Sequence, residues 1–450
     1  MALFFADLHL HSKYSRAVSP RMDLEHLDEG AKKKGLRILG SGDFSHPKWF
    51  AELKSKLEQA EGNAGLFNLK GSRNNVFFIL QNEIATIIST PKGVKKVHHV
   101  VLASDLEVVA QLNDRLGGMG NLSADGRPIF GSTSPAHLVE ICKEVSKEIE
   151  IIPAHAWTPW FGVFGSNSGF NSIKEAYEEQ AKHIFALETG MSSDPAMNWR
   201  LSQLDGFALV SNSDSHSPHP YRIGRECNAF EFEEEKLNYG NLINAIKEKD
   251  RTHFKFTVEV DPNYGKYHFD GHRNCNFSCG PEESGKLKGI CPVCKSKMTI
   301  GVLSRVEELA DRKEGFVPKD AIPYKTLLPL QDLVASCFAV PAMSRKAYAE
   351  TERLMARFGN EFEILLNADE AKLKTEMHGK LAAAILANRE GKLKVKAGFD
   401  GEYGILQLGK DMIATEEGKT EAEVGGEKNP PTQSSFRKSV GGQKDLSEFF

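Results

Sequence analysis

Short apolar runs alternate with segments of helical period along the first 250 residues. Segments such as Leu24–Lys34, Ala136–Lys147 and Leu237–Lys247 place apolar side chains three and four residues apart, which predicts helices. This alternation is typical of βα units around a parallel sheet, and it favours an α/β fold with a closed or nearly closed seven-stranded barrel. The predicted strands are Leu3–Leu8, Leu36–Gly40, Val76–Leu80, Val97–Ala103, Glu150–Pro153, Ile184–Leu187 and Ala208–Val210.

The pattern changes after residue 250 and divides the rest of the chain into three parts. Residues 251–300 are Gly-rich and Cys/His-rich, which predicts a small module held by a metal. Residues 301–410 contain the helical segments Ile300–Arg312 and Ser344–Asn388 and are partly basic, so we expect a DNA-contacting region. Residues 411–450 are rich in Gly, Glu, Lys, Ser and Pro, the composition of a flexible tail.

Composition narrows the class of protein. The formal net charge is −4, so nucleic-acid binding must depend on local basic patches or bound cations. No run of 18 apolar residues is present and the N-terminus does not resemble a signal peptide, so we expect a cytoplasmic protein without a membrane partner. Four of the seven cysteines lie between Cys275 and Cys294, which favours a metal site over a disulfide framework.

Potential metal ligands recur at the ends of the predicted strands. The carboxyl ends of barrel strands converge on one face, so most of these side chains should enter one pocket, although the histidines that open the fourth strand would need a local turn. Mixed imidazole and carboxylate ligands fit two or three divalent ions, Zn, Mn or Mg, and such ions clamp a phosphoester. Either His98 or His99 serves as the ligand, and Asp7 serves as a ligand or only orients His9. The candidate ligands are His9, His11, His46, Glu83, His98, His155, Asp214 and His216.

A zinc ribbon is predicted in residues 251–300. His272 and Cys275 are separated by two residues, as are Cys291 and Cys294, and fifteen residues lie between the two pairs. Such a closed four-ligand site holds a structural zinc. Cys279 and His268 are the alternative ligands.

An aromatic and Gly-rich loop follows His155. Trp157 and Trp160 in this loop either stack on a base drawn out of a duplex or pack into a lid over the barrel. Arg222 and Arg225, shortly after His216, either hold a phosphate or form ordinary surface pairs.

Several motifs resemble the PHP (polymerase and histidinol phosphatase) superfamily. They are Asp-Leu-His-Leu-His-Ser at 7–12, Gly-Asp-Phe-Ser-His-Pro at 42–47, Asn-Glu-Ile at 82–84, His98 before Val-Val-Leu-Ala, Pro-Ala-His at 153–155 and Ser-Asp-Ser-His at 213–216. The resemblance implies a barrel with three ions, in which Glu83 and Asp214 are catalytic. The first ion would be held by His9, His11, Glu83 and Asp214, the second by Glu83, His98 and His155, and the third by His46 and His216. Lys13-Tyr14-Ser15 stands where some members have a further histidine.

The last eight residues resemble the PIP box, a peptide that docks on the PCNA sliding clamp, through Gln443, Leu446, Phe449 and Phe450. The PHP motifs, the Cys-Pro-Val-Cys motif at 291–294 and this terminal peptide together resemble the endonuclease Q family. That resemblance implies a DNA repair enzyme that cuts double-stranded DNA 5′ to deaminated bases (uracil, hypoxanthine, xanthine) or abasic sites, and therefore a nucleoid-associated location. The alternatives are a PHP phosphatase acting on a small phosphomonoester and a non-catalytic, clamp-associated scaffold on DNA.

Overall fold

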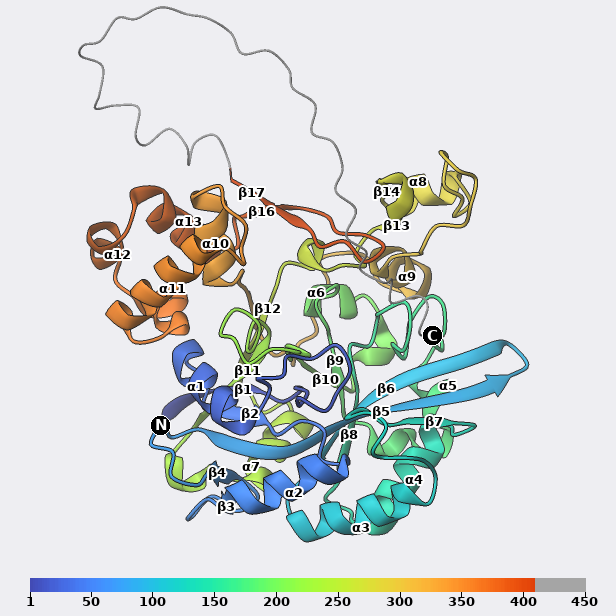
Figure 1. Cartoon of the computed structure of the whole chain (residues 1–450). Helices are drawn as coiled ribbons and strands as arrows, with labels where there is room; N and C mark the ends of the chain where they lie inside the picture. Colours follow the sequence, from blue (N-terminus) through green and yellow to red (C-terminus); the bar gives the residue numbers. More distant parts are fainter. Residues whose placement is uncertain (409–450) are drawn as a thin grey trace, which may run out of the picture.

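The computed structural model describes residues 1–408 (Figure 1). All seven predicted strands are present, and two of them, Glu150–Pro153 and Ala208–Val210, have the predicted bounds. The structure thus confirms the mixed α/β class. The seven are β1 (Ala2–Asp7), β2 (Ile38–Gly40), β5 (Phe77–Thr90), β6 (Gly93–Ala103), β8 (Glu150–Pro153), β9 (Ala186–Glu188) and β10 (Ala208–Val210).

The closed barrel expected from the sequence is not formed by the strand ladders. The largest sheet is open and has eleven strands, and β9 and β10 pair with each other in a separate sheet. Backbone hydrogen bonds outside the ladders, Ala156 N to Glu188 O and His11 N to Ser215 O, connect the two sheets. The further strands of the large sheet are β3 (Leu57–Gln59), β4 (Phe67–Leu69), β7 (Ile129–Gly131), β11 (Cys227–Phe232), β12 (Phe254–Glu259) and β15 (Tyr324–Thr326).

The strands nevertheless enclose a common apolar core. Alternate residues of β1 point to the same side, and Phe4 and Ala6 pack with Val100 of β6, Ile152 of β8 and Ala208 of β10. This alternation is what strand geometry dictates when one face of a sheet is buried. Residues from both sheets therefore share one interior even though their hydrogen-bond ladders are separate.

Helices cover the outside of the strands (Figure 1). The bounds of α1 agree with the prediction because its ends are encoded locally: the Asp23 side chain accepts a hydrogen bond from His26 N, and Gly35 ends the helix with φ 96°. The others in this part are α2 (Pro47–Lys56), α3 (Leu106–Gly117), α4 (Pro135–Val145), α5 (Ile173–Tyr177), α6 (Pro195–Asn198) and α7 (Tyr239–Lys247), while α1 spans Leu24–Lys34.

The predicted division at residue 250 does not coincide with the edge of the sheet. Strand β12 pairs with β11, and β15 pairs with β12, so the large sheet continues past the expected boundary. The Cys/His-rich insert begins after β12 and contains β13 (Asp270–His272), β14 (Phe277–Cys279) and α8 (Pro281–Lys286). Helix α9 (Val302–Leu309) follows it and replaces the longer predicted helix Ile300–Arg312.

The long helical segment predicted over Ser344–Asn388 is interrupted. It contains α11 (Arg345–Phe358), a short π-helix (Glu363–Asn367), α12 (Glu370–Glu376) and α13 (Gly379–Arg389). Helix α10 (Leu330–Cys337) precedes it. Gly359 has φ 102° and ends α11, which periodicity alone did not reveal. A hairpin of β16 (Lys394–Lys396) and β17 (Ile405–Gln407) follows. No helix in residues 1–408 is long and apolar enough to cross a membrane.

Candidate metal centre

The strand ends bring six predicted ligands together. Three residues of this region, Asp43, His155 and Asp214, adopt left-handed backbone with φ 42°, 28° and 46°. Such conformations are costly for residues other than glycine and concentrate at functional sites. Each follows a buried strand, so the chain turns sharply there and directs the side chain into the centre.

The position of His98 follows from the direction of β6. Strand β6 is antiparallel to both β5 and β8, and His98 pairs with Ala85 near Glu83. Its beginning therefore lies at the same face as the carboxyl ends of the parallel strands. The local turn expected for this strand is not needed, because β5 and β6 form one long hairpin.

One group of ligand atoms fits a metal ion. The side chains of His9, His11, Glu83 and Asp214 place one ligand atom each within 4.8 Å of the others. His11 Nε2 lies 3.0 Å from Asp214 Oδ1 and 3.3 Å from Glu83 Oε2. Three of the four side chains are buried, so water does not compete freely for these atoms.

A second group shares Glu83 and adds His98 and His155. Glu83 Oε1 lies 2.6 Å from His98 Nδ1 and 3.1 Å from His155 Nε2, so the two oxygens of one carboxylate serve the two groups. Burial opposes ionisation of Glu83, but the charges of His98 and Arg127 outweigh it and hold the pKa of this carboxyl well below its usual range.

The choice between His98 and His99 is settled by their partners. His99 is fully buried, with Nε2 2.9 Å from Thr86 Oγ1 and Nδ1 2.9 Å from the Tyr177 hydroxyl. Both of its nitrogens are satisfied, and burial lowers its pKa to about 3. His99 is therefore a neutral core residue, and His98 is the one that joins the ligand group.

Outer partners fix the orientation of the ligand rings. Nδ1 of His9 lies 2.9 Å from Glu188 Oε2, Nδ1 of His11 lies 3.2 Å from Asp43 Oδ1, and Nδ1 of His155 lies 2.8 Å from Thr158 Oγ1. In each ring Nε2 is then directed into the centre, the arrangement found around metal ions in proteins. His9 Nε2 is buried and has no hydrogen-bond partner among the described residues, which fits a metal ligand.

Asp7 does not orient His9, which was one of the two roles expected for it. Its carboxylate accepts hydrogen bonds from Ser213 N and Gly224 N, so it holds the chain around Asp214 instead. The orienting carboxylate is Glu188, which lies 179 positions from His9 in the sequence.

His46 and His216 do not join a ligand group in the described residues. The His46 ring stacks on Tyr14 at 4.4 Å, and its Nδ1 is buried without a partner. The His216 ring lies 4.7 Å from that of His11, and its Nδ1 is 3.0 Å from Asp214 O. Both border the centre, but the third ion expected from them stays a prediction.

Arg127 is a site residue that the sequence did not reveal. Its Nη1 donates to Glu83 Oε2 at 3.1 Å, and its Nε is buried without a hydrogen-bond partner in the described chain. The preceding Gly126 allows this approach, because a Cβ there would overlap Asp43 and Ser15. The only local signal was the Asp-Gly-Arg-Pro turn at 125–128, which is not specific.

A cavity of about 250 Å³ opens beside the ligands. The strand ends form one wall, and Lys266, Tyr267 and Tyr403 from the insert and the β16–β17 hairpin form the other. Arg225, Lys266 and Arg222 act against burial and lower the pKa of the Tyr403 hydroxyl to about 8. The strand-side lining residues are His155, Thr158, Glu188, Gly190, Met191, Ser192, Asn212, Ser213, Asp214, His216 and Arg225.

The two tryptophans of the aromatic loop have different positions. Trp157 is 1% exposed, donates from Nε1 to Asn198 Oδ1 at 2.8 Å and packs on Phe164. The expectation that it stacks on a base is corrected, because its ring faces are covered by the core. Trp160 is 42% exposed, and its ring lies 5.9 Å from the ring of Tyr267, which lines the cavity.

The two arginines after His216 also differ. Arg225 lines the cavity and donates to Ser213 O at 3.0 Å, so it braces the chain beside Asp214. The Arg222 guanidinium lies 4.7 Å from the Tyr221 ring centre and 5.9 Å from that of Tyr403. Among the described residues neither forms the surface ion pair that was the alternative.

The four predicted zinc-ribbon ligands converge. His272, Cys275, Cys291 and Cys294 each place a ligand atom within 4.8 Å of the others, and His272 Nδ1 lies 3.2 Å from Cys275 Sγ. Neither alternative ligand belongs to this group: His268 Nδ1 lies 3.1 Å from Ser192 O, and Cys279 packs with Met298. A set of one imidazole and three sulfurs is typical of structural zinc.

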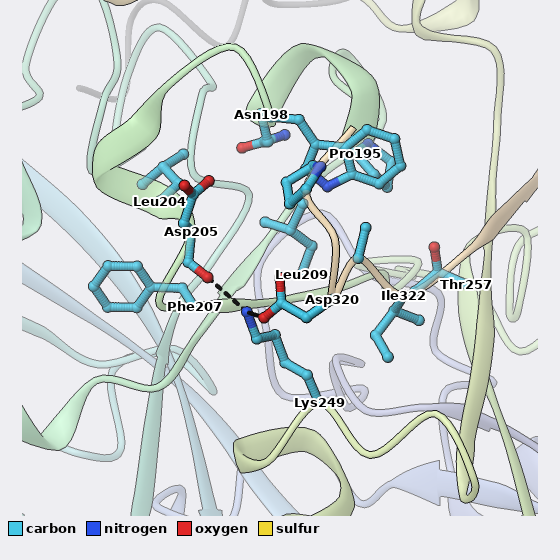
Figure 2. Close-up of a pocket in the computed structure, with 13 residues that line it drawn as sticks. Pro195, Asn198, Leu204, Asp205, Phe207, Leu209, Lys249, Thr257, Asp320 and Ile322 are labelled. Atoms are coloured by element: carbon cyan, nitrogen blue, oxygen red, sulfur yellow. Dashed lines mark hydrogen bonds and ion pairs between the residues drawn. The ribbon is translucent and has the colours of Figure 1, made fainter. Parts of the chain in front are cut away.

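A smaller cavity lies under the segment that connects α9 to β15 (Figure 2). Its volume is about 20 Å³, which is room for roughly one water molecule. Lys249 crosses it to pair with Asp320 and donates to Asp205 O at 2.6 Å. These contacts hold the connecting segment against the turns at Lys249 and Asp205, so this cavity is structural.

The predicted clamp-binding residues lie outside the described part of the chain. These residues are Gln443, Leu446, Phe449 and Phe450.

The chain was compared with family models, with curated proteins and with solved structures. No family model matches it. It is 29% identical over 424 residues to the uncharacterized protein YqxK of Bacillus subtilis, covering 90% of this chain and 100% of that protein. It is 34% identical over 259 residues to the uncharacterized protein MJ0043 of Methanocaldococcus jannaschii, covering 56% of this chain but only 31% of that protein.

Two crystal structures match almost the whole chain. The first is the lesion-specific endonuclease PfuEndoQ of Pyrococcus furiosus, with 30% identity, a TM-score of 0.80, and coverage of 92% of this chain and 98% of that one. The second is endonuclease Q in complex with a 27-mer duplex that carries an abasic lesion at the active site, with 29% identity, a TM-score of 0.82, and coverage of 93% and 100%. The fold and the ligand groups thus define a metal-dependent nuclease. The chain belongs to the endonuclease Q family.

Proposed function

We propose that this protein is a DNA repair endonuclease that hydrolyses the phosphodiester bond 5′ to a deaminated base or an abasic site in duplex DNA. The observation that supports it most directly is the double ligand group on Glu83, beside a cavity with the volume of about 250 Å³. The fold matches a solved endonuclease Q whose duplex has an abasic lesion at its active site.

The residues of the centre fit at least two divalent ions, Zn, Mn or Mg. His9, His11, Glu83 and Asp214 would hold one, and Glu83, His98 and His155 the other, with His46 and His216 available for a third. When bound, such ions polarise the phosphoryl oxygens and make water a stronger nucleophile. We infer that the seven predicted strands, whose apolar side chains share one interior, correspond to the barrel of the PHP superfamily that the sequence motifs resemble.

The surrounding residues orient the ligand histidines and add a positive charge beside Glu83. Glu188, Asp43 and Thr158 each hold one ring nitrogen of a ligand histidine, so the ring cannot turn away. Arg127 uses one nitrogen to contact Glu83, and its partly exposed guanidinium supplies positive charge for a phosphate oxygen beside the ligands.

The cavity beside the centre would receive the lesion nucleotide. A deaminated base pairs less well than its parent, so drawing it out of the duplex costs less of the few kcal/mol that extrusion requires. Trp160 and Tyr267 at the rim and Tyr403 within offer aromatic surfaces, and Arg225 and Lys266 offer positive charge. Trp157 is left out of this role because it is buried.

The test is an incision assay on duplexes that each contain one defined lesion. Deoxyuridine, deoxyinosine, deoxyxanthosine and abasic duplexes should be cut once, on the lesion strand and 5′ to the lesion, leaving 3′-hydroxyl and 5′-phosphate ends. The undamaged duplex should be cut at least about a hundredfold more slowly, the ratio expected from a few kcal/mol of extrusion energy. Equal cutting of damaged and undamaged duplex would contradict the proposal, and turnover of p-nitrophenyl phosphate alone would favour the phosphatase alternative.

The clamp-binding proposal rests on sequence. Deleting residues 443–450 should abolish PCNA binding in a pull-down or calorimetric assay, because Phe449 and Phe450 are the apolar anchors of the PIP-like peptide. Incision of a short oligonucleotide without the clamp should not change. A matching loss of clamp-free incision would assign these residues to the nuclease itself. Clamp binding would also place the enzyme on the nucleoid.

A further inference from the structure

The aromatic loop, residues 157–170, follows the candidate ligand His155 and folds tightly on itself. Gly162 N donates to Thr158 O at 3.3 Å, or slightly closer than a loose contact would be, and closes the first turn of the loop. A Cβ at Gly162 or Gly165 would overlap the backbone of Thr158, so only glycine permits this close packing. The loop is therefore a shaped element beside the metal centre, and its position depends on the contacts that hold it.

The loop contacts both histidines of the second ligand group. Thr158 Oγ1 lies 2.8 Å from Nδ1 of His155. The Phe161 ring packs on the His98 ring with 4.2 Å between their centres, and Phe161 O accepts a hydrogen bond from His98 N at 2.9 Å. The carboxylates that hold the histidines of the first group lie outside the loop. The position of the loop therefore bears on the histidines of the second group and not on those of the first.

A buried arginine of α9 braces the far end of the loop. Arg305 is 6% exposed. Its Nε donates to Phe164 O at 3.0 Å, and its Nη2 donates to Phe170 O at 3.1 Å and to Asn171 Oδ1 at 2.6 Å. Its Nη1 pairs with the exposed Glu308 at 2.7 Å. One guanidinium thus satisfies three acceptors at the end of the loop, and its planar shape fixes their relative positions.

Two further hydrogen bonds hold the loop. Ser166 Oγ donates to Ile300 O at 2.8 Å, shortly before α9 begins. Lys95 of β6 donates to Gly169 O, but this lysine is partly exposed. Water competes for an exposed contact and not for a buried one, so the buried guanidinium is the stronger brace.

Helix α9 is fixed by contacts of its own. Arg200 donates to both carboxylate oxygens of Glu307, at 2.7 and 2.9 Å. On the other side of the helix, Val306 is fully buried in the large apolar core. The helix therefore gives the brace a rigid base that does not depend on the metal ligands.

We propose that Arg305 is a positioning residue of the metal centre: by bracing the aromatic loop, it holds His98 and His155 in the arrangement that binds the second ion. This inference rests on the proposed function, since it takes the ligand groups as a metal centre. Because Arg305 acts through the loop, its loss should weaken the ion of the second group and leave the ion of the first group in place.

The experiment compares Arg305→Lys with the matched control Arg312→Lys. Lysine keeps the positive charge but lacks the planar fork that reaches several acceptors at once. Arg312 lies just beyond α9, and its partners Asp205 and Trp199 lie outside the loop. Exchangeable ions are removed from each protein by mild chelation, and Mn²⁺ binding is measured by electron paramagnetic resonance, which reports the free ion.

The wild type and the control should bind one ion at each ligand group with the same affinities. In Arg305→Lys one ion should bind about tenfold more weakly and the other should be unaffected, because contacts around ligand histidines commonly change metal affinity by that factor. At saturating Mn²⁺ its incision rate should return to that of the wild type, as expected for a residue that acts only on ion binding. Ser166→Ala removes the contact with Ile300 at little change of shape and should weaken the same ion by about threefold.

Unchanged Mn²⁺ affinity in both Arg305→Lys and Ser166→Ala, or an equal loss at both ligand groups, would overturn the positioning role. Incision by Arg305→Lys that stays slow at saturating Mn²⁺ would contradict it as well, and so would a wild type that binds a single Mn²⁺. A wild type that binds Mn²⁺ at both groups but cuts no lesion duplex would instead overturn the proposed function and leave the positioning role in place.

Discussion

Replacing Glu83 by Gln is expected to lower the incision rate by at least about a thousandfold, which corresponds to about 4 kcal/mol of barrier. Glu83 is the residue common to both ligand groups, and its two oxygens contact His11, His98 and His155. The amide keeps the shape of the side chain but removes its charge, so the centre loses its shared ligand while the fold remains intact. Single-turnover kinetics on an abasic duplex, together with metal content per chain, measure the effect.

The matched control is Glu175→Gln, which removes a carboxylate paired with exposed Lys92 and distant from the ligand groups. Its incision rate should equal that of the wild type. Arg127→Ala provides an intermediate case: loss of a charged hydrogen-bond donor should slow incision by about tenfold to a hundredfold without loss of metal. Glu83→Gln with more than about a tenth of wild-type activity would contradict the assigned role, given how much of the barrier such ions supply.

Replacing Cys291 by Ala is expected to remove one tightly held zinc per chain and to unfold the insert locally. Cys291 is fully buried and belongs to the group of four candidate ligands in the predicted zinc ribbon. Structural zinc contributes on the order of 10 kcal/mol to the folding of small modules, and residues 270–300 add only a small apolar cluster around Cys279 and Met298. Zinc analysis after mild chelation and hydrogen exchange over residues 270–300 measure both effects.

Cys142→Ala is the matched control, because Cys142 is equally buried but packs in the large apolar core outside the insert. It should retain the zinc of the insert and its exchange protection. Unchanged zinc content in Cys291→Ala would contradict the prediction that Cys291 binds a structural zinc. Ions at the candidate ligands of the metal centre should exchange independently of the insert, since the two sets of residues share no member.

Where the sequence was informative, the signal was local. All seven strands were predicted because each is a short apolar run, and α1 was placed correctly because Asp23 and Gly35 mark its ends. The convergence of His272, Cys275, Cys291 and Cys294 was predicted because their spacing in the chain is typical of a zinc site. The interruption of Ser344–Asn388 was missed because the apolar period continues across Gly359 and only the backbone conformation there ends the helix.

The site was predicted unevenly for the same reason. Residue types at strand ends identified the six candidate ligands that converge. The family resemblance favoured His98 over His99, and the structure gives the physical reason, because Thr86 and Tyr177 occupy both nitrogens of His99. Trp157 and Trp160 have similar sequence surroundings, but only one of the two is exposed. Burial is a property of the assembled core, and no pattern within the loop distinguishes the two rings.

The sequence by itself determined the chemistry of this protein: which imidazoles, carboxylates and thiols are present and which strands carry them. Those properties depend on residue type and on spacing over a few positions. Tertiary structure decided the antiparallel direction of β6, the open sheet, the orientation of His9 by Glu188 and the contact of Arg127 with Glu83. The last two join residues 179 and 44 positions apart, where no local propensity acts and only the packing of the whole chain brings the side chains together.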